Sequence, residues 1–182
     1  MFADSIDGSL SDRLPIHKAD PSPWKQCCPI DTNNCYSLLH QLLDDQKDVS
    51  LLRFIKREHP DVKELIKRIA SASKAGAKLL ERLAKEDPSI NLKDTGLPPG
   101  EVATREAIAS TKKKELLGKK GDEFEQILLL TQTEALRYAS HLAKVASQTE
   151  PEPNRARALA DLSLEMENLY LEVFKLVFAK TK

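Results

Sequence analysis

Apolar residues recur at helical spacing along most of the chain. In residues 154–182 they alternate steps of three and four, at Leu159, Leu162, Met166, Leu169, Val173 and Leu176. The segment from Gly121 to about Gln148 has the same spacing with one polar position, at Phe124, Leu128, Thr131, Ala135, Tyr138, Leu142 and Val145. This spacing is typical of helices that present a narrow apolar face to a neighbouring helix. We therefore predict two long helices, with four leucines nearly fully buried between them: Leu128, Leu142, Leu162 and Leu169.

Two further amphipathic helices are predicted upstream. The first begins at residues 31–33, whose polar side chains can cap a helix, and runs to about His59. Its apolar stripe consists of Cys35, Leu38, Leu42, Val49, Leu52 and Ile55. The second helix begins with Pro60 in its first turn, where a proline is tolerated, and ends near Glu86.

Residues 87–120 form a long connection with one short helix, between about Glu101 and Leu117. Its first part, residues 87–100, is rich in proline and glycine, so we expect it to be irregular and exposed. Short links on either side force neighbouring helices to be antiparallel, whereas this long connection lets the third long helix run parallel to the second. The pattern predicts an all-α fold: an antiparallel four-helix bundle with the single crossover of ferritin-like proteins.

The N-terminal residues 1–31 differ from the rest of the chain in composition. Prolines recur among their Asp and Ser residues, at Pro15, Pro21, Pro23 and Pro29. Such a segment has little to bury, so we predict an irregular N-terminal arm before a bundle domain at residues 32–182. The arm is either partly disordered or anchored on the bundle through Trp24.

Charge and hydropathy argue against two classes of partner. Lys plus Arg and Asp plus Glu both number 28, so no net charge attracts nucleic acid. The longest apolar run of the bundle region, Ile127–Leu130, is far shorter than the roughly 20 residues that a membrane-spanning helix needs. The N-terminus lacks the basic and apolar regions of a signal peptide. This predicts a cytoplasmic protein as numbered, or an exported one if a signal peptide has been removed.

A ferritin-like bundle raises the question of a dimetal centre, which needs inward carboxylates on two helices and Glu-x-x-His on the other two. The chain contains no Glu-x-x-His. Carboxylates near the middle of the predicted bundle include Asp45, Glu134 and Glu165, and Asp45 is in register with the apolar stripe of its helix. An ionised carboxylate at such a position is costly unless it is paired. The alternatives are a degenerate metal site formed by these three residues or a helix rotated to expose Asp45.

The remaining candidates for chemistry give weak signals. Soft ligand atoms lie at Cys27, Cys28, Cys35 and His40, but adjacent cysteines are unlike the C-x2-C pairs of structural zinc sites. We favour free thiols, with Cys35 packed as a small apolar residue. The histidines are too widely spread to suggest a nucleophile, a base and an orienting group: His17, His40, His59 and His141. We predict no cofactor and no enzymatic activity.

Two segments resemble a known family. DVSLLRFIKREHPDVKELIKRIA has an apolar helix, a short break and Val-Lys before the next helix, and GDEFEQILLLTQTEAL is similar to a Gly-x-x-Phe-Asp helix opening, with Glu125 at the Asp position. Residues 45–177 thereby resemble an uncharacterised bacterial ferritin-like family, a domain of unknown function that is often exported and sometimes labelled as an outer membrane protein. The resemblance implies a four-helix fold and no established activity. Where the family has Asp-His and a later His, this chain has Ala72-Ser73 and Leu136.

Apolar helix faces without a catalytic cluster favour a soluble, non-enzymatic helical bundle that acts through its surface. It would act by self-association or by binding a protein partner. The alternative is a degenerate ferritin-like metal-binding protein. The first interpretation predicts a homo-oligomer or a protein partner, and the second predicts bound iron, manganese or zinc.

Overall fold

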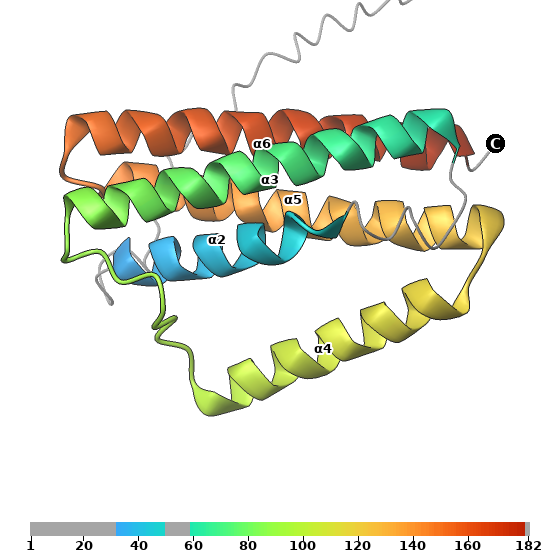
Figure 1. Ribbon diagram of the computed structural model, residues 1–182, viewed down its shortest axis with the longest axis horizontal. Helices are drawn as coiled ribbons and strands as arrows, with labels where there is room; N and C mark the ends of the chain where they lie inside the picture. Colours follow the sequence, from blue (N-terminus) through green and yellow to red (C-terminus); the bar gives the residue numbers. More distant parts are fainter. Residues whose placement is uncertain (1–31, 50–58, 181–182) are drawn as a thin grey trace, which may run out of the picture. The chain divides into compact units, whose positions relative to one another are not determined.

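The computed structural model describes residues 32–49 and 59–180 of the 182-residue chain. These residues form five α-helices and no strand, which confirms the all-α class (Figure 1). The helices are α2 (Thr32–Gln46), α3 (Pro60–Glu86), α4 (Pro99–Gly118), α5 (Gly121–Thr149) and α6 (Pro153–Lys180). They belong to one compact unit, and the predicted N-terminal arm at residues 1–31 lies outside the described residues. None of the described helices is long and apolar enough to cross a membrane.

Four of the helices, α2, α3, α5 and α6, pack side by side and are called the helical core below. α5 packs most extensively on α6, α2 packs on both α3 and α5, and α3 packs on α6, so the contacts close into a ring. In Figure 1, α2 and α6 run from left to right, whereas α3 and α5 run from right to left. Each packed pair in the ring is therefore antiparallel, and α3 is parallel to α5. α4 makes the long connection between them and contacts mainly α5.

Most predicted helix boundaries agree with the structure. α3 spans the predicted residues, with Pro60 in its first turn and Asp87 as its C-cap. α5 and α6 begin and end within one or two residues of the prediction. α4 begins earlier than expected, at Pro99, because a proline in the first helical turn loses no hydrogen bond. The preceding segment is irregular and largely exposed, as predicted, although Ile90 is buried and anchors it.

α2 is shorter than predicted. The helix ends at Gln46 and not near His59, and residues 50–58 lie outside the described residues. Asp44 and Asp45 lie in its last turn, where negative charge interacts unfavourably with the negative end of the helix dipole. The spacing of apolar residues carries no information about this electrostatic cost, which explains why the predicted helix is too long.

The buried face of α2 is also rotated from the predicted stripe. Tyr36, Leu39 and Leu43 are fully buried, whereas Leu38 and Leu42 are only half-buried. Because α2 packs on both α3 and α5, the face that lies between these two helices is the one that becomes buried.

The predicted apolar face of α6 is confirmed over most of its length. Its buried members are Leu159, Leu162, Met166, Leu169 and Val173, and the last position, Leu176, is half-buried. The prediction for α5 is correct only at its start, where Phe124 and Leu128 are buried.

Further along α5, the buried positions shift to Leu129, Gln132, Leu136, Ala139, Ala143 and Ala146. The predictions that Tyr138 and Leu142 lie in the core are wrong, since Tyr138 is exposed and Leu142 is half-buried. α5 packs on both α2 and α6, and its alanines present the least bulk at the shared face, which lets the neighbouring backbones approach.

Small residues in the middle of α3, within residues 71–77, allow a close approach of its neighbours. A Cβ atom on Gly76 would lie 2.8 Å from Cδ1 of Leu43 and 2.9 Å from Cδ1 of Leu162. α2, α3 and α6 therefore meet at this glycine, with Ala72, Ser73 and Ala77 buried around it.

The first prediction concerns Leu162, which is buried against Gly76. Leu162→Ala should lower the free energy of unfolding by about 2–5 kcal/mol, because it leaves a cavity among three helices. Glu165→Ala, one turn further along α6 at an exposed position, is the control and should change stability by less than about 0.5 kcal/mol. Denaturant midpoints of the two variants would contradict the packing described above if the Glu165 variant were the less stable one.

The second prediction concerns the space at Gly76. Gly76→Val should destabilise the fold by about 1–3 kcal/mol, because the added side chain must displace Leu43 and Leu162. Ala75→Val, at the neighbouring exposed position, carries the same β-branched side chain and should cost only about 0.5 kcal/mol in helix propensity. Thermal unfolding of both variants measures the difference. Helix propensity alone would make Gly76→Val neutral or stabilising, so a Gly76→Val chain no less stable than the wild type would contradict the close packing at position 76.

Candidate functional site

The three carboxylates predicted as metal ligands lie on three different helices and are all exposed. Asp45 is at the end of α2, Glu134 on α5 forms an ion pair with Lys112 of α4, and Glu165 lies on α6 beside the groove between α3 and α6. Within the described ranges, no group of three or more His, Cys, Asp or Glu residues could hold a metal ion. The metal-binding alternative stays a prediction, and no contact among the described residues favours it.

The expectation that Asp45 lies in the apolar face of its helix is wrong, because the rotation of α2 turns it to the surface. It lies instead in a cavity between α2 and α4. Partial burial there and the neighbouring Asp44 raise the pKa of the Asp45 carboxyl, against the lowering effect of Lys47.

The cysteine and histidine candidates are dispersed. Cys35 is buried in α2, as predicted for a small apolar residue, whereas Cys27 and Cys28 lie outside the described residues. His40 is 3.5 Å from Glu81 through its Nε2 atom. Nδ1 of His141 lies 3.2 Å from Oγ of Ser140, a hydroxyl group that a nucleophilic site would need.

The Ser140 and His141 pair is explained by helix geometry. The Ser140 hydroxyl donates to the carbonyl oxygen of Arg137, and Nδ1 of His141 lies 2.9 Å from the same oxygen. Hydroxyl groups in helix interiors commonly bond to the carbonyl of the preceding turn. The serine proton is therefore directed at the backbone and not at the imidazole.

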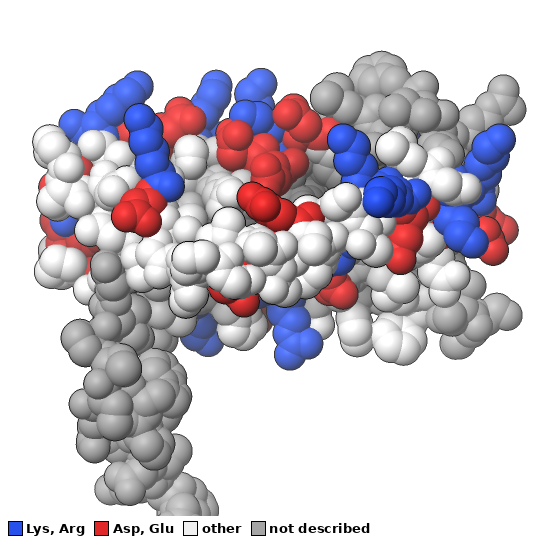
Figure 2. All heavy atoms as spheres, turned by 90° about the horizontal axis from the view of Figure 1, so that it is seen from below, with Lys and Arg blue, Asp and Glu red and all other residues white. Residues whose placement is uncertain are grey.

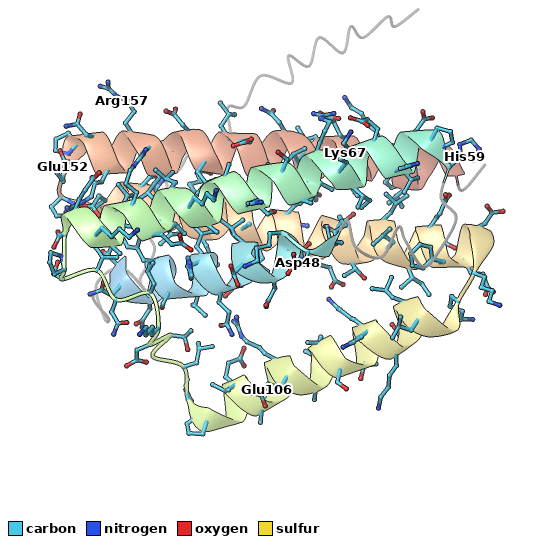
Figure 3. The ribbon with its side chains drawn as sticks, viewed as in Figure 1. Asp48, His59, Lys67, Glu106, Glu152 and Arg157 are labelled. Carbon is cyan, nitrogen blue, oxygen red and sulfur yellow. The ribbon has the colours of Figure 1, made fainter. Side chains whose placement is uncertain are left out.

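A cluster of charged and polar side chains links the helices at one end of the helical core. The Tyr36 hydroxyl of α2 donates to Glu150 at 2.6 Å, in the short connection between α5 and α6. Arg155 of α6 donates to Glu150 at 2.9 Å through Nε and to Asp87, at the end of α3, at 2.8 Å. Glu152 accepts hydrogen bonds from the first backbone N–H groups of α6, and Figure 3 shows it at the end where α5 leads into α6. This polar cluster joins all four core helices.

The polar cluster shifts the pKa values of its members. Burial and the Glu150 carboxylate raise the pKa of Tyr36. Burial alone would raise the pKa of Glu150, but the hydrogen bonds from Tyr36 and Arg155 outweigh it and hold that pKa below its ordinary value. The pKa of Asp87 is lowered mainly by hydrogen bonds from Ser89, with Arg155 adding to the effect. Sequence analysis missed this cluster because its members lie far apart along the chain, with Tyr36 and Glu150 separated by 114 positions.

α4 lies against the rest of the unit only loosely. Among its described residues only Leu116 is buried. A cavity of about 690 Å³ separates its first turns from α2, lined by apolar groups such as Leu38, Leu42 and Val102. Arg105 of α4 spans this space, donates to the Tyr138 hydroxyl at 2.9 Å and stacks over its ring. Figure 2, which views the molecule from the α4 side, shows Lys and Arg mixed with Asp and Glu and no field of one sign.

The outward side of α6 carries a second row of residues, apolar except at Glu167, which is called the outer α6 face below. Its members alternate steps of four and three and are all exposed: Ala160, Leu164, Glu167, Leu171, Phe174 and Phe178. Leu164 and Phe178 are each 58% exposed, the highest fraction among the large apolar side chains of the described residues. The rings of Phe174 and Phe178 pack edge to face at 4.7 Å, so the end of the row is a continuous aromatic surface.

The described residues thus form a helical unit with a polar cluster that joins helix ends and an exposed apolar row on α6. Compared with known proteins, the chain matches no protein-family model, no curated protein and no solved structure. The resemblance to a ferritin-like family therefore stays a prediction.

The third prediction concerns the pH dependence that the polar cluster creates. Glu150 and Asp87 have lowered pKa values in the folded protein, so their stabilising effect is complete above the ordinary carboxyl range and is lost as the pH falls through the lowered values. Arg155→Gln should therefore destabilise the fold at neutral pH, by about 1–3 kcal/mol for lost charged hydrogen bonds. The difference from the wild type should shrink on acidification below the carboxyl range.

The matched control for this prediction is Arg157→Gln, two residues along α6, whose exposed side chain projects from the helix in Figure 3. Urea unfolding at a series of pH values should show a small and pH-independent effect for this variant. A pH-independent difference for Arg155→Gln would contradict the assignment of the lowered pKa values to its contacts.

Proposed function

We propose that the described helices form a four-helix bundle with ferritin-like connectivity. The closed ring of contacts among α2, α3, α5 and α6 supports this, because every packed pair in the ring is antiparallel. The parallel direction of α3 and α5 supports the single crossover, for which α4 and its flanking segments supply the length.

The function that the geometry supports best is non-enzymatic: the bundle acts by self-association or by binding a protein partner. The observation that carries this proposal is the outer α6 face. Contiguous exposed apolar surface is costly in water, and monomeric proteins seldom keep large patches of it unless it serves an interaction. Leu164, Leu171, Phe174 and Phe178 are each more than 40% exposed on this one helix face.

The polar groups of the described residues support the same proposal. Tyr36, Asp87, Glu150 and Arg155 satisfy one another across the helix ends, so their role is to hold the bundle together. Lys112, Glu134, Arg68 and Glu172 form ion pairs between exposed helix faces. These groups are engaged in stabilising contacts, whereas the large side chains of the outer α6 face have the exposed area that a partner would cover.

The fourth prediction tests this function in the cells that make the protein. Chemical cross-linking should convert the wild-type chain into a discrete larger species, and Leu171→Glu should abolish that species, because a charge at the centre of the outer α6 face cannot be buried against a partner. Ile108→Glu introduces the same charge at an exposed apolar position of α4, a helix that contacts mainly α5, and should leave the species unchanged.

Circular dichroism of the purified variants checks that both remain helical. A wild-type chain that stays single under cross-linking would contradict the proposed function. So would a larger species that persists unchanged in the Leu171 variant, since the outer α6 face would then have no part in the association.

A further inference from the structure

α6 carries two apolar rows on opposite sides. The inner row, which begins at Leu159 and continues through Met166, is buried in the helical core. The outer row places residues at the first and fourth positions of a seven-residue repeat, conventionally called a and d. The a positions are Leu164, Leu171 and Phe178, and the d positions are Ala160, Glu167 and Phe174. Helices that pack against one another carry this repeat, so the spacing of the outer row indicates a helical partner.

The sizes of the residues along the outer row indicate which helix fits. The row begins with the small Ala160 and ends with the large, stacked Phe174 and Phe178. A second copy of α6 laid antiparallel about its midpoint pairs small with large: Ala160 faces Phe178, Leu164 faces Phe174 and Glu167 faces Leu171. Each of these layers joins an a position to a d position, which is the packing of antiparallel helices. A parallel copy would leave a gap at the alanine layer and crowd the phenylalanine layer.

The position of the charged residue in the outer row also favours an antiparallel pair. Glu167 is its only charged member. In a parallel pair it would lie opposite Glu167 of the second copy, and like charges brought together at an interface are costly. In the antiparallel pair each Glu167 lies opposite Leu171 of the second copy, and the two Glu167 residues are apart.

Arg137 of α5 lies close to the same level as Glu167. The hydrogen bond of 2.8 Å from the Ser163 hydroxyl to the carbonyl oxygen of Ser140 fixes how α5 and α6 run past each other. The two helices are antiparallel, so Arg137, three residues before Ser140, lies at the level of Met166, three residues after Ser163. Glu167 is the next residue along α6. The exposed guanidinium can therefore balance the glutamate as the contact closes.

We propose that the outer α6 face binds the same face of a second copy of this chain, with the two α6 helices antiparallel about a two-fold axis. The inference rests on the proposed function and names its partner. Such a contact is isologous, so it closes at the dimer and does not continue into a filament. The row spans residues 160–178, about 27 Å at 1.5 Å per residue, which is a small contact area for a dimer. We expect a dissociation constant in the micromolar range.

The stoichiometry is tested by sedimentation equilibrium of the purified full chain over a wide range of concentrations. The wild type should be in monomer–dimer equilibrium, Leu171→Glu should be monomeric, and Ile108→Glu should match the wild type. Glu167→Leu should strengthen the dimer by about tenfold or more, because it removes two carboxylates that must otherwise be desolvated. A Glu167→Leu dimer weaker than the wild type would overturn the proposed seam.

The antiparallel direction is tested by disulfide trapping in a chain with Cys27→Ser, Cys28→Ser and Cys35→Ala. A mixture of an Ala160→Cys chain and a Phe178→Cys chain should give a cross-linked pair on oxidation, whereas Ala160→Cys alone should not. A cross-link in the Ala160→Cys sample alone would show a parallel pair and overturn the proposal.

A purified wild type that is monomeric at every concentration would also overturn the self-association. If the cross-linked species in cells then still depended on Leu171, the proposed function would stand with a different protein as the partner. If that species were absent as well, both the self-association and the proposed function would be contradicted.

Discussion

At Gly76, the side chains of Leu43 and Leu162 come so close to the backbone of α3 that even a methyl group would have to displace them. This contact determines the spacing of three helices at once, because α2 and α6 both approach the same turn of α3. The buried alanines of α5 serve the same purpose on the opposite side of the helical core. With little bulk between backbones, the larger side chains of each helix can interdigitate, and their burial from water provides the main stabilisation of the fold.

The ends of the helical core are held by polar contacts. Arg155 reaches both Glu150 and Asp87, and Tyr36 completes the set from α2. Charged hydrogen bonds are stronger and more directional than apolar packing, so this cluster can specify which helix ends lie together, while the apolar core contributes most of the stability. Acid weakens the cluster because its carboxylates, which have lowered pKa values, lose their negative charge on protonation: Asp87, Glu150 and Glu152.

α6 connects the fold to the proposed function. One side of this helix is a complete core face, and the opposite side is a second apolar row that no described helix covers. Burying Leu171 and its neighbours against another helix would remove from water the apolar surface that folding leaves exposed. The same helix thus stabilises the helical core on one side and carries the exposed apolar row of the proposed function on the other.

The sequence by itself determined the helices. Proline, glycine and capping positions act locally, so the bounds of α3, α5 and α6 followed from the chain, as did the buried row of α6 from Leu159 to Val173. The outer row is also visible in the sequence, but only one apolar face was predicted for each helix, so this second row was missed.

Only the tertiary structure decided how α2 and α5 are rotated and where α2 ends. A helix packed against two neighbours buries the side that lies between them, and that side depends on where the neighbours are. Tyr138 and Asp45 were placed in the core on spacing alone, whereas the structure turns Tyr138 toward Arg105 and leaves Asp45 at the surface. The polar cluster could not be predicted from the sequence either. Tyr36 and Glu150 become neighbours only when the packing of the whole core brings four helix ends together.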